Sequence, residues 1–285
     1  MNANRLASAS AMVMAAGMGT RMRPLTDTMP KPLVTVAGKA LIDYSLDALG
    51  AAGVARAVVN VHYRADQLEA HLAQRHALPA ITVSDERELL LETGGGMVRA
   101  QGLLADPFFC LNSDNIWSDG PDNVFRALSA AWDAERMDAL LLLASPARAG
   151  NYHGRGDFHL DEAGRISRRQ GDAPAPYIYT GIQLVPHRLL RDAPQGPFSP
   201  NVLWQRAIGE GRLHGIVHLG EWYEVGDPAA IAPTAAWLAS LAGDDRKFRT
   251  FFGQGWSLRS GGLFPRPPTR FCRCAGRPAE SPFHR

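Results

Sequence analysis

An apolar run that passes directly into a glycine turn is the feature that most constrains the fold of this chain. Residues 11–16 (AMVMAA) carry no polar side chain, which is the pattern of a strand buried in a parallel sheet. The segment 17–33, GMGTRMRPLTDTMPKPL, follows at once. Gly17 and Gly19 can adopt positive φ angles, so that consecutive backbone N–H groups converge on an anion. We therefore predict a phosphate-binding loop at the carboxyl end of a central strand.

Two cationic side chains in this segment suit a triphosphate. Arg21 can donate two parallel hydrogen bonds to phosphate oxygens, and Lys31 supplies a compact charge. The prolines on both sides of Lys31 restrict the backbone and so fix where its ammonium group points. The segment is not a P-loop, because no lysine follows the glycines directly. It also lacks the third glycine of the dinucleotide fingerprint, since Met22 occupies that place.

The first half of the chain alternates strand-like and helix-like segments. Apolar spacing predicts helices over 41–52, 65–74, 97–104 and 124–133. Short apolar runs predict strands over 57–61, 81–83 and 108–111, while periodicity alone does not classify 139–144. This alternation predicts an α/β fold with a Rossmann-like, mostly parallel sheet and helices on both faces. Ligands of such sheets bind at the carboxyl ends of the strands.

The composition changes near residue 150 to glycine, tyrosine and short turns. We predict a hairpin over 158–166, strands over 177–185 and 213–218, and a closing helix over 228–241. Residues 10–149 are therefore interpreted as a nucleotide-binding half and 150–242 as a smaller lobe, which together form one catalytic domain. Residues 243–285 show no apolar period and are predicted to be a disordered tail, with a basic interaction arm as the alternative.

Composition limits the partners of the chain. A formal charge of +2 is too small to predict nucleic-acid or membrane-surface binding. The three cysteines are an odd number, and Cys272 and Cys274 are too close together for the usual zinc spacing, which favours a reduced, cytoplasmic setting. The run 11–16 is too short to span a bilayer. We expect a protein without nucleic-acid or membrane partners, either a monomer or a small homo-oligomer.

Taken whole, the segment 17–33 resembles the signature of the sugar-1-phosphate nucleotidyltransferases. It reads Gly-x-Gly-Thr-Arg-x-Arg-Pro-Leu-Thr, then a short spacer, then Pro-Lys-Pro-Leu. The resemblance is strong here and moderate over roughly 10–240. It implies the nucleotide-diphospho-sugar transferase type of fold, with a sugar-side lobe after residue 150. It also implies Arg21 and Lys31 as catalytic cations, and a nucleotide contacted by Ala15, Ala16, Gly17, Gly19, Thr20 and Arg21.

The same resemblance implies a Mg²⁺ cofactor held by two carboxylates. Asp114 follows the apolar run 108–111, at a strand end where Mg²⁺ can take protein carboxylates, phosphate oxygens and water. Glu224 lies in Trp-Tyr-Glu-Val-Gly-Asp-Pro, where the family usually has Trp-x-Asp-Val-Gly-Thr-Pro. Glutamate is one methylene longer than aspartate but can still coordinate. Asp227, at the place of the usual threonine, is the alternative second ligand.

The segment 91–96, LETGGG, resembles the base-recognition loop of these enzymes. Its glycines would let a flat base approach the backbone, with Glu92, Thr93 and Gly94 in contact with the nucleotide. A helix N-terminus capped by Thr93 is the alternative, and the two roles can coexist. Glu92 with three glycines is closer to the uridylyltransferases that act on N-acetylmuramate 1-phosphate in peptidoglycan recycling. The implied sugar-phosphate contacts are Lys31, Asn112, Gly156, Asp157, Thr180 and Gly181.

The resemblance implies transfer of a nucleotidyl group from an NTP to a sugar 1-phosphate, with release of pyrophosphate. Arg21 would bind the β- and γ-phosphates, and Lys31 the α-phosphate and the incoming sugar phosphate. UTP with N-acetylmuramate 1-phosphate is the leading pair, and GTP with mannose 1-phosphate is the alternative. A regulatory domain that binds nucleotide sugars without turnover is a second alternative. It is favoured only by Glu224 and the atypical tail.

Overall fold

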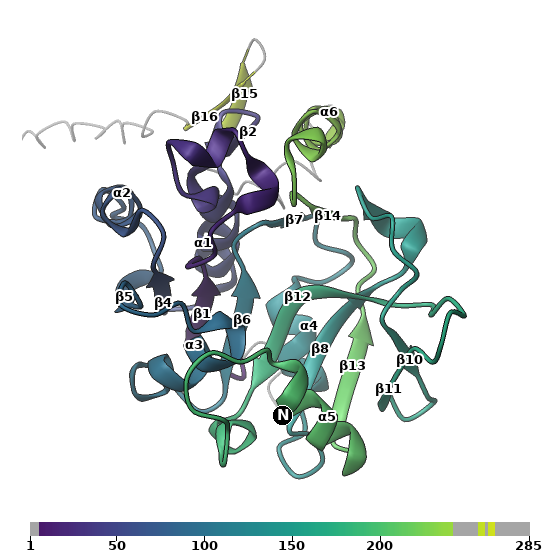
Figure 1. The fold of residues 1–285 in the computed structure, drawn as a ribbon. Helices are drawn as coiled ribbons and strands as arrows, with labels where there is room; N and C mark the ends of the chain where they lie inside the picture. Colours follow the sequence, from purple (N-terminus) through teal and green to yellow (C-terminus); the bar gives the residue numbers. More distant parts are fainter. Residues whose placement is uncertain (1–5, 242–255, 260–261, 266–285) are drawn as a thin grey trace, which may run out of the picture.

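The computed structural model describes residues 6–241, 256–259 and 262–265. Its centre is a seven-stranded sheet with the order β13–β8–β12–β6–β1–β4–β5 (Figure 1). Adjacent strands run parallel, except that β12 is antiparallel to both of its neighbours. The predicted mostly parallel sheet is therefore confirmed. The strands are β1 Ser10–Met14, β4 Arg56–Val61, β5 Ala80–Asp85, β6 Phe108–Asn112, β8 Ala139–Ala144, β12 Ile178–Val185 and β13 Leu213–Val217.

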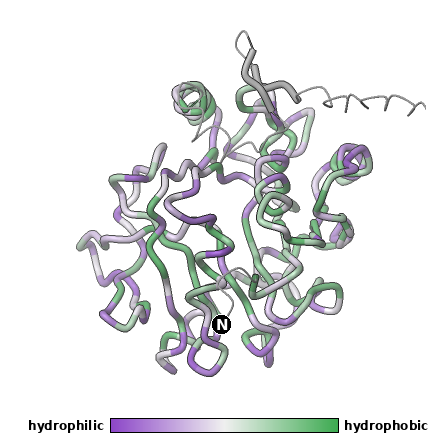
Figure 2. The backbone as a smooth tube through the Cα atoms, turned by 180° about the vertical axis from the view of Figure 1, so that it is seen from behind, coloured by the Kyte–Doolittle hydropathy of each residue, from purple (hydrophilic) through white to green (hydrophobic). Residues whose placement is uncertain are grey.

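Helices cover both faces of this sheet, as predicted. Alternate residues of β1 belong to different hydrophobic clusters, Val13 to one and Met12 to the other, because successive side chains of a strand point to opposite faces. The strands are hydrophobic and the peripheral loops hydrophilic (Figure 2). Helices α1, α2 and α4 pack on the Val13 side, and α3 and α5 on the Met12 side. Their bounds are Leu41–Ala52, Ala65–Leu72, Val124–Ala131, Glu92–Ala100 and Asn201–Gly209.

A smaller layer lies beyond the carboxyl ends of the central strands. It contains the three-stranded sheet β7–β14–β9 and helix α6 (Figure 1). A third hydrophobic cluster joins α6 and β7 to the segment that follows the glycine turn, through Leu238, Ile116 and Met22. The elements are β7 Asn115–Trp117, β9 Ala149–Gly150, β14 Trp222–Glu224 and α6 Ile231–Leu241. The glycine turn, β7 and β14 are therefore held together at one end of the central sheet.

Short elements complete the described chain. The hairpins are β2 Thr35–Val36 with β3 Lys39–Ala40, β10 Phe158–Leu160 with β11 Ile166–Arg168, and β15 Trp256–Arg259 with β16 Gly262–Pro265. The 3₁₀ helices are η1 Thr20–Met22, η2 Leu25–Asp27, η3 Lys31–Leu33, η4 Gln101–Leu103, η5 Pro146–Arg148, η6 His187–Leu190 and η7 Pro228–Ala230. In the part of the chain that the structure describes, no helix has the length and apolar character that crossing a bilayer requires.

Three expectations differ from the structure. Helix α3 begins at Glu92, five residues before the predicted 97, and Leu91 is its N-cap without a side-chain cap, so the proposed Thr93 cap is wrong. Strands β12 and β13 come from the second half of the chain yet belong to the central sheet. The predicted disordered tail contains the hairpin β15–β16, whose first strand alternates apolar and polar residues. The rest of that tail lies outside the described residues.

Candidate active site

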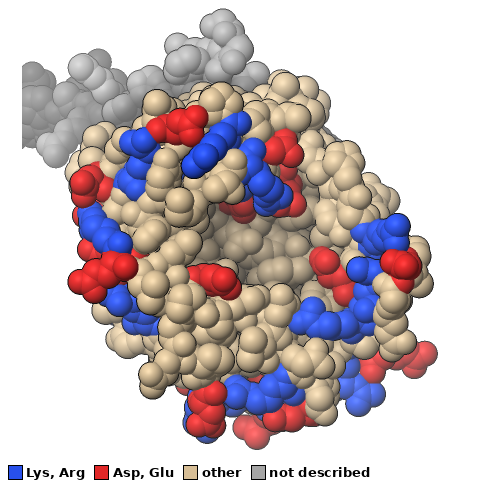
Figure 3. All heavy atoms as spheres, in the orientation of Figure 1, with Lys and Arg blue, Asp and Glu red and all other residues tan. Residues whose placement is uncertain are grey.

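A cavity of 440 Å³ opens at the carboxyl ends of β1, β4 and β6. In the space-filling view it is the hollow at the centre of the face, with acidic and basic side chains around its rim (Figure 3). Most of the predicted nucleotide-side residues line it. They are Ala15, Ala16, Gly17, Gly19, Thr20, Arg21, Lys31, Glu92 and Thr93, and they are joined there by Asn112 and Asp114.

The glycine turn brings Lys31 back against the end of β1. Gly19 has φ 63°, and a Cβ atom on it would lie 2.9 Å from both Lys31 Cβ and Thr26 Cγ2. Only glycine therefore allows this close approach. Thr26 Oγ1 donates a hydrogen bond to the Gly19 carbonyl oxygen at 2.8 Å, which holds the turn. Gly17, by contrast, does not adopt a positive φ, and its Cβ position is open.

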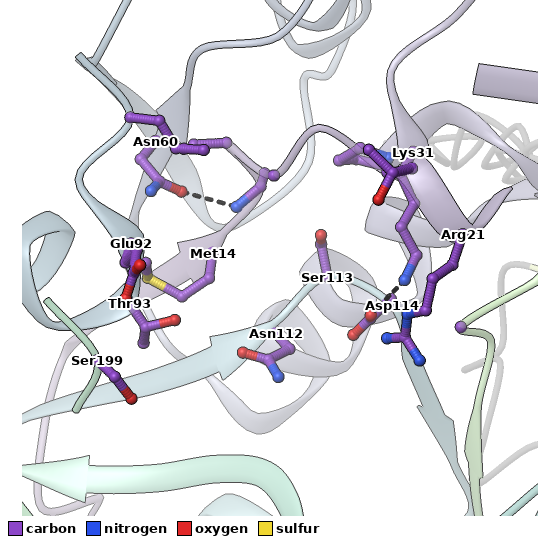
Figure 4. Close-up of a pocket in the computed structure, with 18 of the residues that line it drawn as sticks. Met14, Arg21, Lys31, Asn60, Glu92, Thr93, Asn112, Ser113, Asp114 and Ser199 are labelled. Atoms are coloured by element: carbon purple, nitrogen blue, oxygen red, sulfur yellow. Dashed lines mark hydrogen bonds and ion pairs between the residues drawn. The ribbon is translucent and has the colours of Figure 1, made fainter. Parts of the chain in front are cut away.

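Lys31 and Asp114 meet inside the cavity (Figure 4). Lys31 Nζ lies 2.5 Å from Asp114 Oδ2, and the two side chains are only 14% and 20% exposed. The other carboxylate oxygen, Asp114 Oδ1, is buried without a hydrogen-bond partner. An acceptor in that condition is costly unless a ligand supplies a proton or a positive charge. The site therefore has an unused anionic oxygen beside a cation.

Glu224 is brought to the same region by strand pairing. It lies opposite Asn115 in the β7–β14 ladder, and Val225 N donates a hydrogen bond to the Asp114 carbonyl oxygen at 2.9 Å. Arg21 Nη2 lies 3.3 Å from Glu224 Oε1. Asp227 has a structural role instead, because its Oδ1 accepts a hydrogen bond from Ala230 N at 3.1 Å and caps η7. The geometry therefore favours Glu224 over Asp227 as the second carboxylate.

These carboxylates fit a magnesium ion. Mg²⁺ is bound through one or two protein carboxylates, with phosphate oxygens and water completing an octahedron. Asp114 offers the orphaned oxygen and directly precedes β7, and Glu224 lies on β14, which pairs with β7. Glu224 does not itself line the cavity. Among residues 6–241, no group of three or more His, Cys, Asp or Glu side chains could hold a metal. A metal at Asp114 would therefore depend on substrate oxygens for much of its coordination.

The three glycines of LETGGG allow α3 to pack closely against other segments of the same protein. A Cβ atom would lie 2.3 Å from the Phe198 ring if placed on Gly94, and 2.4 Å from the Gly196 carbonyl oxygen if placed on Gly95. All three glycines are buried, and Gly94 does not line the cavity. Glycine is therefore needed at these positions because α3 packs closely against its neighbours. Glu92 lines the cavity and has φ 57°, which is uncommon for a residue other than glycine.

The predicted sugar-side residues lie further away. Gly156, Asp157, Thr180 and Gly181 do not line the cavity. Asp157 Oδ2 accepts a hydrogen bond from Tyr179 N at 2.9 Å, and the buried Thr180 hydroxyl donates to the Leu142 carbonyl oxygen at 2.8 Å. Both side chains are thus engaged within the fold. Gly181, with φ 80°, packs behind the cavity-lining Asn112, because a Cβ atom on it would lie 2.8 Å from Asn112 Nδ2.

Several lining residues are absent from the sequence-based prediction. Asn60 is a polar residue near the end of the apolar strand 57–61, a position that could have indicated it. Ser199 and Pro200 belong to no motif and reach the cavity because Gly94 N donates a hydrogen bond to the Phe198 carbonyl oxygen at 2.9 Å. The remaining unpredicted lining residues are Met14, Pro32, Leu90, Ser113 and Gly226.

Comparison with known proteins identifies the family. The sequence profile described as nucleotidyl transferase matches residues 10–166. An N-acetylmuramate alpha-1-phosphate uridylyltransferase from Caulobacter vibrioides is 48% identical over 233 residues, which is 80% of this chain and 96% of that protein. A protein of the same name from Neisseria meningitidis is 33% identical, over 76% of this chain and 92% of its own length. The chain belongs to the nucleotidyl transferase family, and the resemblance of the segment 17–33 is confirmed.

Other similar proteins include one more relative in sequence and two solved structures. A mannose-1-phosphate guanyltransferase from Schizosaccharomyces pombe is 31% identical over 81% of this chain, which spans 65% of that enzyme. The inositol-1-phosphate CTP transferase from T. maritima has a TM-score of 0.64 at 19% identity, over 87% of this chain and 96% of its own. A UDP-glucose pyrophosphorylase bound to UDP-glucose has a TM-score of 0.66 at 14% identity, over 81% and 98%. These structures establish the fold alone.

Proposed function

We propose that this protein transfers a uridylyl group from UTP to N-acetylmuramate 1-phosphate in a Mg²⁺-dependent reaction that releases pyrophosphate. The observation that carries the proposal is the convergence of the glycine turn, Arg21, Lys31 and Asp114 in one cavity. The choice of substrates is supported by the relative from Caulobacter vibrioides, which is matched along 96% of its length. The segment LETGGG also favours this subgroup.

The chain's own residues would act by binding and electrostatics. A sugar phosphate is already an anionic nucleophile, so no strong base is needed, and the barrier lies in bringing two anions together. Lys31 would neutralise the α-phosphate and the incoming phosphate, and Arg21 would bind the β- and γ-phosphates. Both residues line the cavity, which supports these roles. Mg²⁺ held by Asp114 and Glu224 would add positive charge at the phosphate oxygens.

Two other functions can be distinguished from uridylyl transfer by experiment. Guanylyl transfer to mannose 1-phosphate is supported by the 31% identity to the enzyme from Schizosaccharomyces pombe. A binding domain without turnover would be expected to have lost part of its cationic apparatus. Arg21 and Lys31 are both present and both line the cavity, and this favours an enzyme.

Pyrophosphate release from a panel of substrates tests the proposal. UTP, GTP, CTP and dTTP would each be paired with N-acetylmuramate, N-acetylglucosamine and mannose 1-phosphates, with Mg²⁺ and with EDTA. We expect the highest kcat/KM for UTP with N-acetylmuramate 1-phosphate, and no release in EDTA. A higher value for GTP with mannose 1-phosphate would establish the guanylyl alternative. Binding of nucleotide sugars without release from any pair would establish the regulatory one.

A further inference from the structure

A buried polar bridge joins two walls of the cavity. Ala15 N, at the end of β1, donates a hydrogen bond to Asn60 Oδ1 at 2.7 Å. Asn60 Nδ2 donates in turn to Glu86 Oε1 at 2.9 Å, and Leu91 N, just before α3, donates to Glu86 Oε2 at 3.3 Å. The Glu86 carboxylate therefore connects two parts of the site. Through Asn60 it is linked to the end of β1, which precedes the glycine turn, and through Leu91 to the start of α3, which contains the glycines of LETGGG.

The amide of Asn60 has only one satisfactory orientation in this bridge. Its oxygen must face the Ala15 N–H group, which can only donate, and its NH₂ group must face the acceptor oxygen of Glu86. Glu86 thus fixes which way Asn60 points. Ala15 and Asn60 both line the cavity, whereas Glu86 does not. Any effect of Glu86 on a ligand must pass through these neighbours.

Glu86 is held firmly although burying a carboxyl group is costly. The residue is 1% exposed, and burial raises the pKa of its carboxyl group, against the opposing effect of the donors Asn60 and Leu91. The charged or titratable groups that face it are Arg99 from α3 and His62, which follows β4. His62 Nδ1 lies 2.7 Å from the Glu86 carbonyl oxygen, and Glu86 N donates to the Val61 carbonyl oxygen at 2.8 Å.

The third glycine of LETGGG makes room for the bridge. A Cβ atom on Gly96 would lie 2.9 Å from Glu86 Oε1, 3.2 Å from Asn60 Nδ2 and 3.0 Å from Met14 Cε. The contact with Glu86 Oε1 is too close without a shift, and the other two are tighter than usual. An alanine there would therefore press on the hydrogen bond between Glu86 and Asn60. The glycine run and the buried carboxylate therefore belong to one arrangement.

We propose that Glu86 is a positioning residue for the nucleotide, which sets the separation and alignment of the two walls between which the base and α-phosphate bind. One wall includes Ala15 and Asn60, and the other includes Leu90, Glu92 and Thr93. Leu91, whose N–H group donates to Glu86, lies within this second segment. This inference rests on the proposed function, since it takes the bound molecule to be an NTP. Glu86 is hydrogen-bonded to Asn60 on one side and to Leu91 on the other, and it does not itself line the cavity.

The Glu86→Gln substitution tests the inference directly. Glutamine has nearly the same shape as glutamate but offers one acceptor oxygen and one NH₂ group. Its NH₂ group must therefore face another donor, either the Asn60 NH₂ group or the Leu91 N–H group. Loss of one buried hydrogen bond predicts a KM for UTP raised about tenfold. The kcat and the KM for the sugar phosphate are expected to stay close to wild type. Glu88→Gln is the matched control, because Glu88 is exposed and carries the same charge two residues away.

A reciprocal exchange should restore the bridge. In the double variant Asn60→Asp, Glu86→Gln, the new aspartate can accept from Ala15 N and from the glutamine NH₂ group, and the glutamine oxygen can accept from Leu91 N. We expect its KM for UTP to return to within about twofold of wild type. Asn60→Asp alone would set two carboxylates against each other and should raise this KM more than Glu86→Gln does. A role in stability alone predicts no such selective recovery of UTP binding.

The outcomes separate the inference from the proposed function. If Glu86→Gln leaves the KM for UTP at the level of Glu88→Gln, the inference is wrong. It is equally wrong if kcat and both KM values change together with a fall in melting temperature. If Glu86→Gln does not fold, Gly96→Ala replaces it, and an unchanged KM for UTP then overturns the inference. Should no substrate pair react, calorimetric UTP affinity of the same variants still tests positioning, while the proposed function has failed.

Discussion

The nucleotide side and the sugar side of this molecule are built differently. On the nucleotide side, one contiguous segment supplies the glycine turn, Arg21 and Lys31, and all three line the cavity. On the sugar side, Gly156 and Asp157 follow η5, and Thr180 and Gly181 belong to β12; none of these residues lines the cavity. The residues predicted to bind the triphosphate are thus concentrated in one segment. The residues predicted to contact only the sugar phosphate lie in separate segments of the chain.

The difference extends to how each side uses its polar groups. Asp114, at the cavity, retains a buried oxygen without a partner, which leaves it ready for a ligand. Asp157, by contrast, has its carboxylate engaged by Tyr179 N, and the Thr180 hydroxyl is bound to a carbonyl oxygen. An unsatisfied group costs stability in the free protein, and satisfied groups contribute to it. We therefore expect substitutions on the two sides to affect different measured quantities.

Asp114→Asn should have the largest effect. The neutral amide removes the charge opposite Lys31 and the orphaned carboxylate oxygen proposed to bind Mg²⁺. We expect pyrophosphate release to fall by about 10³ or more, with little change in melting temperature. Asp157→Asn is the matched sugar-side control and should lower stability more than turnover. If Asp157→Asn reduces turnover as much as Asp114→Asn does, the contrast between the two sides does not hold.

Lys31→Met should come next, with turnover lowered roughly 10²–10³, the usual effect of removing one electrostatic stabiliser. UTP affinity should change much less, because the ammonium group is proposed to act mainly on the reacting phosphate. Stopped-flow turnover and calorimetric UTP binding would be measured on the same preparations. The exposed Arg23, changed to Met, is the control. Wild-type turnover in Lys31→Met would remove this residue from the proposed mechanism.

Glu224→Ala and Asp227→Ala should separate a ligand from a cap. Glu224→Ala is expected to lower turnover about tenfold and to raise the Mg²⁺ concentration needed for half-maximal rate. Asp227→Ala should mainly destabilise the fold, by about 1 kcal/mol, because its carboxylate caps η7. Mg²⁺ titrations and thermal melts of both variants provide the comparison. A raised Mg²⁺ requirement in Asp227→Ala alone would reverse the assignment.

The smallest expected effect is a pH dependence of stability on the nucleotide side. Burial raises the folded-state pKa of Glu86 above its unfolded value, so folding shifts its proton equilibrium toward the protonated form relative to the unfolded chain. Its contribution to stability is present at low pH and is lost as the pH rises through the folded pKa. The unfolding free energy of wild type minus that of Glu86→Gln should therefore increase as the pH is lowered from 7 to 5. A constant difference would contradict the raised pKa.

The parts of the fold and site that could be predicted from the sequence are those encoded in contiguous motifs. The run 11–16 and the segment 17–33 identify the central strand, the turn and both cations without knowledge of distant residues. The start of helix α3 differs from its prediction because the glycines there, which hide the apolar period, are required by contacts with Phe198 and Gly196. Ser199 and Pro200 reach the cavity through the same contact. Such residues follow from tertiary packing and cannot be inferred from local pattern.

The position of β12 limits how the molecule can move. This strand, from the second half of the chain, lies between β6 and β8 and is hydrogen-bonded to both. A hinge at residue 150 that separated the two halves would break these backbone ladders, so the halves cannot open and close like two jaws. Any adjustment on ligand binding would therefore involve segments outside the central sheet, among them the cavity-lining residues of 17–33 and 199–200. The central sheet would then act as a fixed base for the cavity at the carboxyl ends of its strands.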